Sequence, residues 1–120
     1  MSNCLARLVP PLFWLMISLI TLFLLMEQSK STSLFPYVDK VMHALIFAIL
    51  TALGYLAYAK QGKWLYLGII TYGAITEILQ GAYTQTRLAS IGDWLADVVG
   101  VLLCVILINT LNRLPQPHVR

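Results

Sequence analysis

Four long apolar segments divide the chain. They cover about residues 8–26, 40–59, 64–83 and 91–111, and a helix of roughly 20 residues is long enough to cross a bilayer. Because backbone polar groups in lipid must be satisfied within their own segment, these runs predict helices and not open strands. We therefore expect an all-α, membrane-spanning bundle of four helices that forms a single domain over residues 1–120.

The first segment has two interpretations. Pro10 and Pro11 suit the first turn of a helix. A cleaved signal peptide is the alternative, since Arg7 precedes the apolar run, but the run is longer than a signal core and no small-residue cleavage site follows Met26. We favour the retained helix, followed by an irregular polar linker over 27–36.

Polar residues mark the starts of later helices. Asp39 is at the natural N-cap position of the second segment, and the stretch from Ser90 to Asp93 resembles an acidic capping box at the start of the fourth. The stretch 60–63 is short and basic, so the second and third segments should form an antiparallel hairpin. Residues 84–90 should then turn the chain back into the fourth segment.

Composition agrees with a membrane domain and leaves no room for a soluble catalytic domain. Hydrophobic residues make up 59% of the chain and charged residues 11%, with a mean hydropathy of +0.79. The formal net charge is +3, but the bases are scattered singly, so we expect no nucleic-acid partner. At the termini and the second loop the bases are Arg7, Lys60, Lys63, Arg113 and Arg120; elsewhere they are Lys30, Lys40 and Arg87. This excess predicts that both termini are cytoplasmic.

The unusual polar residues should meet at one end of the bundle, opposite the termini. They lie in the first turns of the second and fourth helices, the last turns of the third, and the connection between the third and fourth. Ionisable groups beside lipid are functional candidates by default. The candidate binding residues are Asp39, Lys40, His43, Glu77, Gln80, Arg87, Asp93 and Asp97.

Each candidate also has a structural interpretation. The two aspartates at helix starts can be caps, and the two bases can extend to the membrane surface. His43 can be a hydrogen-bonded packing residue, and Gln80 can bond a neighbouring helix. Glu77 and Asp97 are harder to explain in this way, because each is a turn or more inside its predicted helix. We favour a functional role for these two.

The charges of the cluster do not balance. Its four carboxylates face two permanent cations, so we expect a proton, a cation or a basic ligand to make up the difference. Glu77 and His43 are the candidates for an acid or base in catalysis. The acidic residues and His43 match no fixed metal spacing, so we expect no metal site and no cofactor.

The same residues form an ordered motif. It reads Asp39-Lys40-x-x-His43, Glu77-x-x-Gln80, Arg87, Asp93-x-x-x-Asp97-x-x-Gly100. The motif, over about residues 37–111, resembles the VanZ-like family of small bacterial integral membrane proteins. In that family the position of Asp97 is commonly asparagine, which puts a neutral hydrogen-bonding role for this position in doubt.

The resemblance implies a multi-pass protein of the bacterial inner or plasma membrane, within the cell envelope. The named member of the family is associated with low-level resistance to the glycopeptide antibiotic teicoplanin, and no biochemical activity is established for the family. The motif residues are the ones that the polar pattern selects independently.

Three functions remain open from the sequence. The chain could bind an amphiphile or lipid headgroup, with Lys40 and Arg87 contacting anionic groups. It could be a small intramembrane enzyme acting on a lipid-linked substrate, with Glu77 or His43 as acid or base. It could also be a structural membrane subunit in which the cluster locks three helices together. Membrane lipids are the expected partners, and the oligomeric state, a homo-oligomer included, is left open.

Overall fold

The computed structural model describes every residue except 1, 27–36, 85–89, 116 and 118–120. The described residues contain four α-helices and no strand, which confirms the all-α prediction. The helices are α1 (Asn3–Leu25), α2 (Val38–Tyr58), α3 (Lys63–Tyr83) and α4 (Ile91–Arg113). A short 3-10 helix, η1 (Ala59–Gln61), and Gly62 connect α2 to α3.

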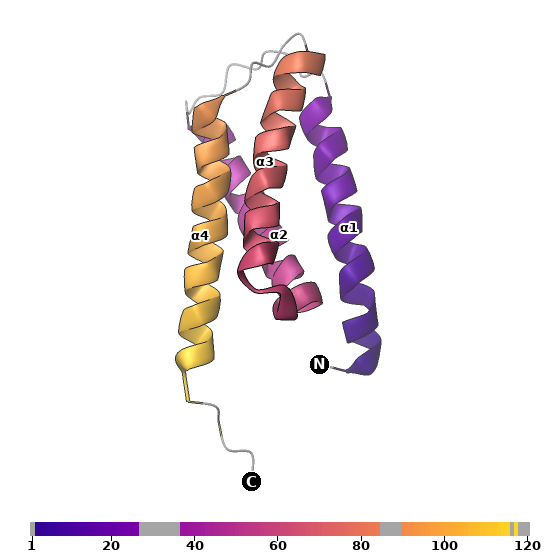
Figure 1. Cartoon of the computed structure of the whole chain (residues 1–120), viewed down its shortest axis with the longest axis vertical. Helices are drawn as coiled ribbons and strands as arrows, with labels where there is room; N and C mark the ends of the chain where they lie inside the picture. The colour runs from indigo at the N-terminus through magenta and orange to yellow at the C-terminus, as the bar shows by residue number, and fades with distance from the viewer. Residues whose placement is uncertain (1, 27–36, 85–89, 116, 118–120) are drawn as a thin grey trace.

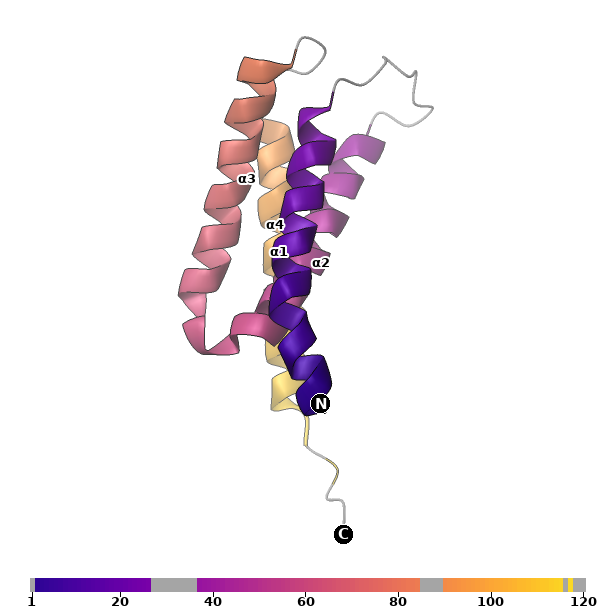
Figure 2. The same cartoon turned by 90° about the vertical axis from the view of Figure 1, so that its right-hand side faces the viewer.

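The four helices run alternately up and down in an elongated bundle of 58 × 27 × 25 Å. Both termini therefore lie at the same end, as predicted, with the η1 turn (Figures 1 and 2). Within the described residues, α2 packs against all three other helices, whereas α1 and α4 make no contact with each other. The end opposite the termini gathers the starts of α2 and α4 and the end of α3, and we call it the loop end.

The first helix begins earlier than the sequence suggested. It starts at Asn3 and not near residue 8, so Pro10 and Pro11 lie inside the helix instead of in its first turn. Each proline removes only one intrahelical donor. The turn before them is held by the Ala6 N–H, which donates to Ser2 O at 3.1 Å. The buried Phe13 anchors the turn that follows.

The capping predictions are half right. Asp39 is not an N-cap, because α2 begins at Val38 with Tyr37 as its cap residue; the Asp39 carboxylate is turned toward His43 one turn further on. Ser90 does cap α4, accepting a hydrogen bond from the Asp93 N–H at 3.2 Å. The Ser90 N–H donates to a carboxylate of another helix, described below.

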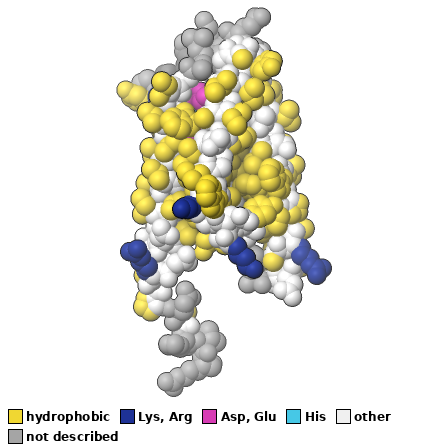
Figure 3. Space-filling view, viewed as in Figure 1, with side chains coloured by type: hydrophobic (Ala, Val, Ile, Leu, Met, Phe, Trp, Pro, Cys, Tyr) yellow, Lys and Arg dark blue, Asp and Glu magenta, His cyan; other side chains and the backbone are white. Residues whose placement is uncertain are grey.

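The outside of the bundle is apolar. Large side chains such as Ile78 and Ile106 are more than half exposed, and hydrophobic side chains are spread over the face shown in Figure 3. Three helical stretches, Asn3–Leu25, Val38–Gln61 and Ile91–Arg113, are long and apolar enough to cross a membrane. The chain is thus a multi-pass membrane protein. The helix α3 is as long as α2, at 21 residues. It carries two polar residues of the candidate cluster, Glu77 and Gln80, which lower its mean hydropathy.

Two glycines allow close packing around the polar residues. A Cβ atom at Gly100 of α4 would overlap the backbone of Ala44 in α2, with the Ala44 Cα only 2.9 Å away. A Cβ atom at Gly73 of α3 would lie 3.0 Å from Asp97 Oδ2 and 3.1 Å from a ring atom of Phe47. Small residues at helix contacts let backbones approach in this way, and here they bring α2, α3 and α4 together beside Asp97.

Candidate functional site

The site is centred on His43, in the second turn of α2. The side chain is 3% exposed, and its Nδ1 lies 2.8 Å from Oδ1 of Asp97, which is 0% exposed. Asp97 comes from the second turn of α4, so this buried contact joins the two helices one turn from the Gly100 approach. The close backbone contact therefore places an imidazole and a carboxylate together away from solvent.

Glu77 of α3 completes the buried group. It is 5% exposed, and its Oε1 lies 3.9 Å from His43 Nδ1. Its other oxygen, Oε2, accepts a hydrogen bond from the Ser90 N–H at 3.1 Å. This bond replaces the reciprocal arm of the expected capping box and fixes the orientation of the Glu77 carboxylate. We call His43, Glu77 and Asp97 the buried triad.

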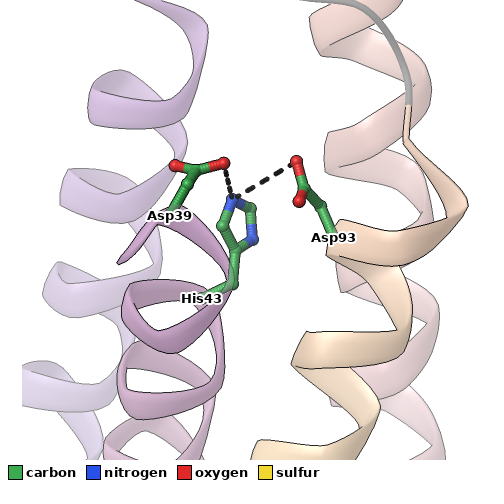
Figure 4. Close-up of side chains that lie close together, drawn as sticks. All are labelled: Asp39, His43 and Asp93. Atoms are coloured by element: carbon green, nitrogen blue, oxygen red, sulfur yellow. Dashed lines mark ion pairs between the residues drawn. The ribbon is translucent and has the colours of Figure 1, made fainter. Parts of the chain in front are cut away.

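Two further carboxylates face the opposite nitrogen of the imidazole. The Nε2 atom of His43 is 3.9 Å from Asp39 Oδ2 and 4.0 Å from Asp93 Oδ2 (Figure 4). Asp93 is also held through Oδ1 by Lys40 Nζ at 3.0 Å. The imidazole thus lies between a buried pair of carboxylates on its Nδ1 side and an outer pair on its Nε2 side.

The remaining predicted residues have different placements. Gln80 is 2% exposed, and its Nε2 donates to Leu24 O at 2.8 Å. This bond satisfies a carbonyl at the end of α1, where no intrahelical donor follows, so the interpretation that Gln80 bonds a neighbouring helix is confirmed. Arg87 lies outside the described residues.

Three buried atoms of the triad have no hydrogen-bond partner among the described residues. They are His43 Nε2, Glu77 Oε1 and Asp97 Oδ2. Lys40 is already paired with Asp93, and the Asp39 side chain is 59% exposed. Among the described residues, the carboxylates of Glu77 and Asp97 therefore have no lysine or arginine partner and face only the His43 imidazole. Buried charges and unpaired polar atoms are costly, which indicates a site suited to a bound positive group.

The described residues contain two groups with ligand types suitable for a metal ion. One is Asp39, His43 and Asp93; the other is the buried triad, and within each group one ligand atom per residue lies within 4.8 Å of the others. Sequence spacing did not reveal either group, because the ligands are contributed by two or three helices. The i, i+4 pair of Asp39 and His43 was the only local signal.

A small apolar pocket adjoins Glu77. It has a volume of about 210 Å³ and lies between α3 and the start of α4. Its lining residues are Ala74, Glu77, Ile78, Ser90, Ile91 and Trp94. Ile78 and Ile91 are exposed on the outside of the bundle, so the pocket opens toward the side. Sequence spacing does not indicate this pocket, because Ser90 and Trp94 approach Glu77 only when α3 and α4 pack together.

No protein-family model, curated protein or solved structure matches this chain. The function is therefore argued from the geometry of the loop end.

Proposed function

We propose that the chain binds an amphiphile or a lipid headgroup at its loop end. The observation that carries this proposal is the position of Glu77, whose Oε1 is buried and unpaired among the described residues while its side chain lines an apolar pocket. Ligand sites are usually apolar cavities with a few well-placed polar groups. An apolar pocket that adjoins a buried glutamate suits a molecule with a polar head and an apolar body.

The polar atoms of the loop end favour one chemical class of headgroup. The unpaired atoms of Glu77 and Asp97 are acceptors, so they favour a headgroup that brings a hydrogen-bond donor or positive charge. Lys40 remains 42% exposed although it is paired with Asp93, which leaves it able to contact an anionic group on the same ligand. A headgroup with both kinds of charge uses both features.

Native mass spectrometry of the detergent-purified protein tests the proposal. We expect wild type to retain a defined lipid or added amphiphile, and Glu77→Gln to lose most of it. Glu27→Gln is the matched control, because it removes the same charge from the polar linker predicted outside the helices. Equal retention by wild type and both variants, or no retention by wild type, would contradict the proposal.

The bacterial envelope and a role in glycopeptide resistance are part of the same proposal, and the motif resemblance supports them. Teicoplanin susceptibility of a sensitive bacterium tests this part, with wild type and Glu77→Gln expressed at matched membrane levels. Protection by wild type and not by the variant is expected. If neither protects, the link to resistance is wrong for this chain.

We also propose that the termini face the cytoplasm. Among the described residues, the bases Arg7, Lys60, Lys63 and Arg113 gather at the terminal end without an acidic neighbour there, and basic side chains are visible at that end in Figure 3. Such an excess marks the cytoplasmic side. Cys4 is exposed at this end, so a membrane-impermeant maleimide should label it only after the cells are opened. Labelling in intact cells would reverse the orientation.

Acid–base catalysis on a lipid-linked substrate is the second candidate. A specific observation favours it: Asp97 contacts His43 Nδ1 at 2.8 Å while Nε2 has no hydrogen-bond partner among the described residues. A carboxylate that orients a histidine in this way leaves the other nitrogen available to transfer a proton. Turnover of a lipid-linked substrate should then be lost in His43→Gln. Unchanged turnover in that variant would exclude His43 as the base.

A further inference from the structure

The buried triad has the composition and size of a metal-binding site. We propose that His43, Glu77 and Asp97 bind one divalent transition-metal ion of the Zn²⁺ type. The ligands are His43 Nδ1, Glu77 Oε1 and the Asp97 carboxylate. The inference goes beyond amphiphile binding and does not depend on it, and an ion and a headgroup donor would compete for the same oxygen, Glu77 Oε1.

The distances within the triad suit one ion. His43 Nδ1 is 2.8 Å from Asp97 Oδ1 and 3.9 Å from Glu77 Oε1, and one ligand atom from each residue lies within 4.8 Å of the others. An ion about 2.1 Å from each ligand needs ligand–ligand separations of roughly 3.0–3.5 Å, and at most about 4.2 Å. Side-chain rotations that move these atoms by roughly 1 Å or less therefore complete the ligand set.

The charge of the triad specifies a divalent ion. Glu77 and Asp97 supply two negative charges with a neutral imidazole, and the nearby Lys40 ammonium is already paired with Asp93. One divalent ion neutralises the triad. A mixture of one imidazole nitrogen and two carboxylate oxygens favours Zn²⁺ or Mn²⁺ over Ca²⁺ and Mg²⁺, which prefer oxygen alone.

The groups around the triad are those expected around a metal site. A histidine bound to a metal commonly donates its other ring N–H to a carboxylate, which fixes its orientation. Here Nε2 faces Asp39 and Asp93 at 3.9 and 4.0 Å (Figure 4), so a shift of about 1 Å would bring either carboxylate within hydrogen-bond distance. The Ser90 N–H holds Glu77 Oε2, which leaves Oε1 for the ion. One ion would thus give the unpaired oxygens of Glu77 and Asp97 a partner.

Metal titration of the full-length, tag-free protein in detergent tests the inference. After removal of metal with EDTA, Zn²⁺ is added and the bound ion is counted by elemental analysis and calorimetry. We expect one ion per chain, and at least about 100-fold weaker binding by Asp97→Ala and His43→Ala, since even neighbouring groups are typically worth 10- to 100-fold. His118→Ala, the other histidine of the chain, should bind as wild type does.

X-ray absorption at the zinc edge of the wild type keeps the test independent of how well the variants fold. One imidazole with oxygen ligands and no sulfur is expected. Absence of a bound ion, sulfur ligands, more than one imidazole, or equal binding by the folded His43→Ala variant would overturn the inference. Lipid retention is measured separately in EDTA. A Glu77-dependent lipid without any ion would support the proposed function while overturning the metal site.

Discussion

The α2–α4 and α1–α3 interfaces are built in opposite ways. At α2–α4 the backbones meet directly, because a side chain at Gly100 would overlap the Ala44 backbone, and the interface holds the buried contact between His43 and Asp97. At α1–α3 the helices leave an apolar groove of about 420 Å³, lined by aromatic side chains that include Phe13, Trp64 and Tyr72. The first interface is tight and charged; the second is open and apolar.

The difference lies in the side chains at each contact. Small residues allow the close approach that fixes the positions of buried polar groups. Large rings line the groove between α1 and α3, and the polar contacts between these helices are made by neutral groups. Tyr72 Oη lies 2.7 Å from Thr21 Oγ1, and the Gln80 amide donates to Leu24 O. The contact between His43 and Asp97 therefore belongs to the tight α2–α4 interface. Substitutions at the two interfaces should differ in their effect on stability.

The largest expected effect is at Gly100. In Gly100→Ala the new Cβ atom overlaps the Ala44 backbone, and we expect a loss of about 3 kcal/mol or more, or roughly 12 °C in the melting temperature in detergent. Gly68→Ala is the matched control, because a Cβ there meets nothing within 4 Å. Equal effects of the two substitutions would show that the tight interface is not what holds the bundle.

A smaller loss is expected at Asp97. Asp97→Ala leaves the buried His43 Nδ1 without its partner, which should destabilise the protein by about 1–3 kcal/mol. Asp97→Asn keeps an oxygen at the same place and should cost less than half as much. The comparison is made by thermal unfolding in detergent after EDTA treatment, and the ranking would be contradicted if asparagine were as damaging as alanine.

The open interface should respond weakly. Tyr72→Phe removes the hydroxyl that lies 3.1 Å from Ile17 O and 2.7 Å from Thr21 Oγ1. Hydrogen bonds between helices in membranes average about 0.6 kcal/mol, so the melting temperature should fall by only a few degrees. Hydrogen exchange should rise in α1 and not in α4. Faster exchange across α4 would show that the two interfaces are coupled.

The smallest effect is expected at Lys40. The Lys40 side chain, which is paired with Asp93, is 42% exposed. Exposed ion pairs contribute little to the free energy of unfolding. Lys40→Met should therefore leave the melting temperature close to that of Lys63→Met, a base at the other end of the bundle. A clear fall for Lys40→Met alone would mean that the outer carboxylates depend on this ammonium for stability.

The fold and the membership of the site were largely predictable from the sequence. Hydropathy located all four helices, and the alternation of helix directions brought His43, Glu77 and Asp97 to one end. The partner of each side chain was not predictable. Asp39 is not a cap, because α2 begins one residue before it at Val38, and its carboxylate lies 3.9 Å from His43 Nε2. The Ser90 N–H donates to Glu77 of another helix. Such contacts are decided by packing, which helical periodicity does not specify.

An aspartate and an asparagine at position 97 would differ in one physical respect. An asparagine oxygen could accept a hydrogen bond from His43 as the Asp97 oxygen does, but it would carry no charge. With aspartate the buried triad holds two carboxylates instead of one. This second buried carboxylate is the basis for proposing a bound cation or a donor-bearing headgroup at the site.

The thermal stability of Glu77→Gln tests most directly whether the buried triad serves a ligand or only the fold. The substitution keeps an oxygen for the Ser90 N–H and removes a buried charge that has an unpaired oxygen among the described residues. Measured in detergent without added lipid or metal, the melting temperature should be unchanged or higher than that of wild type, because functional groups are often held at a cost to stability. A clear decrease would contradict the account and make the triad a structural lock between α2, α3 and α4.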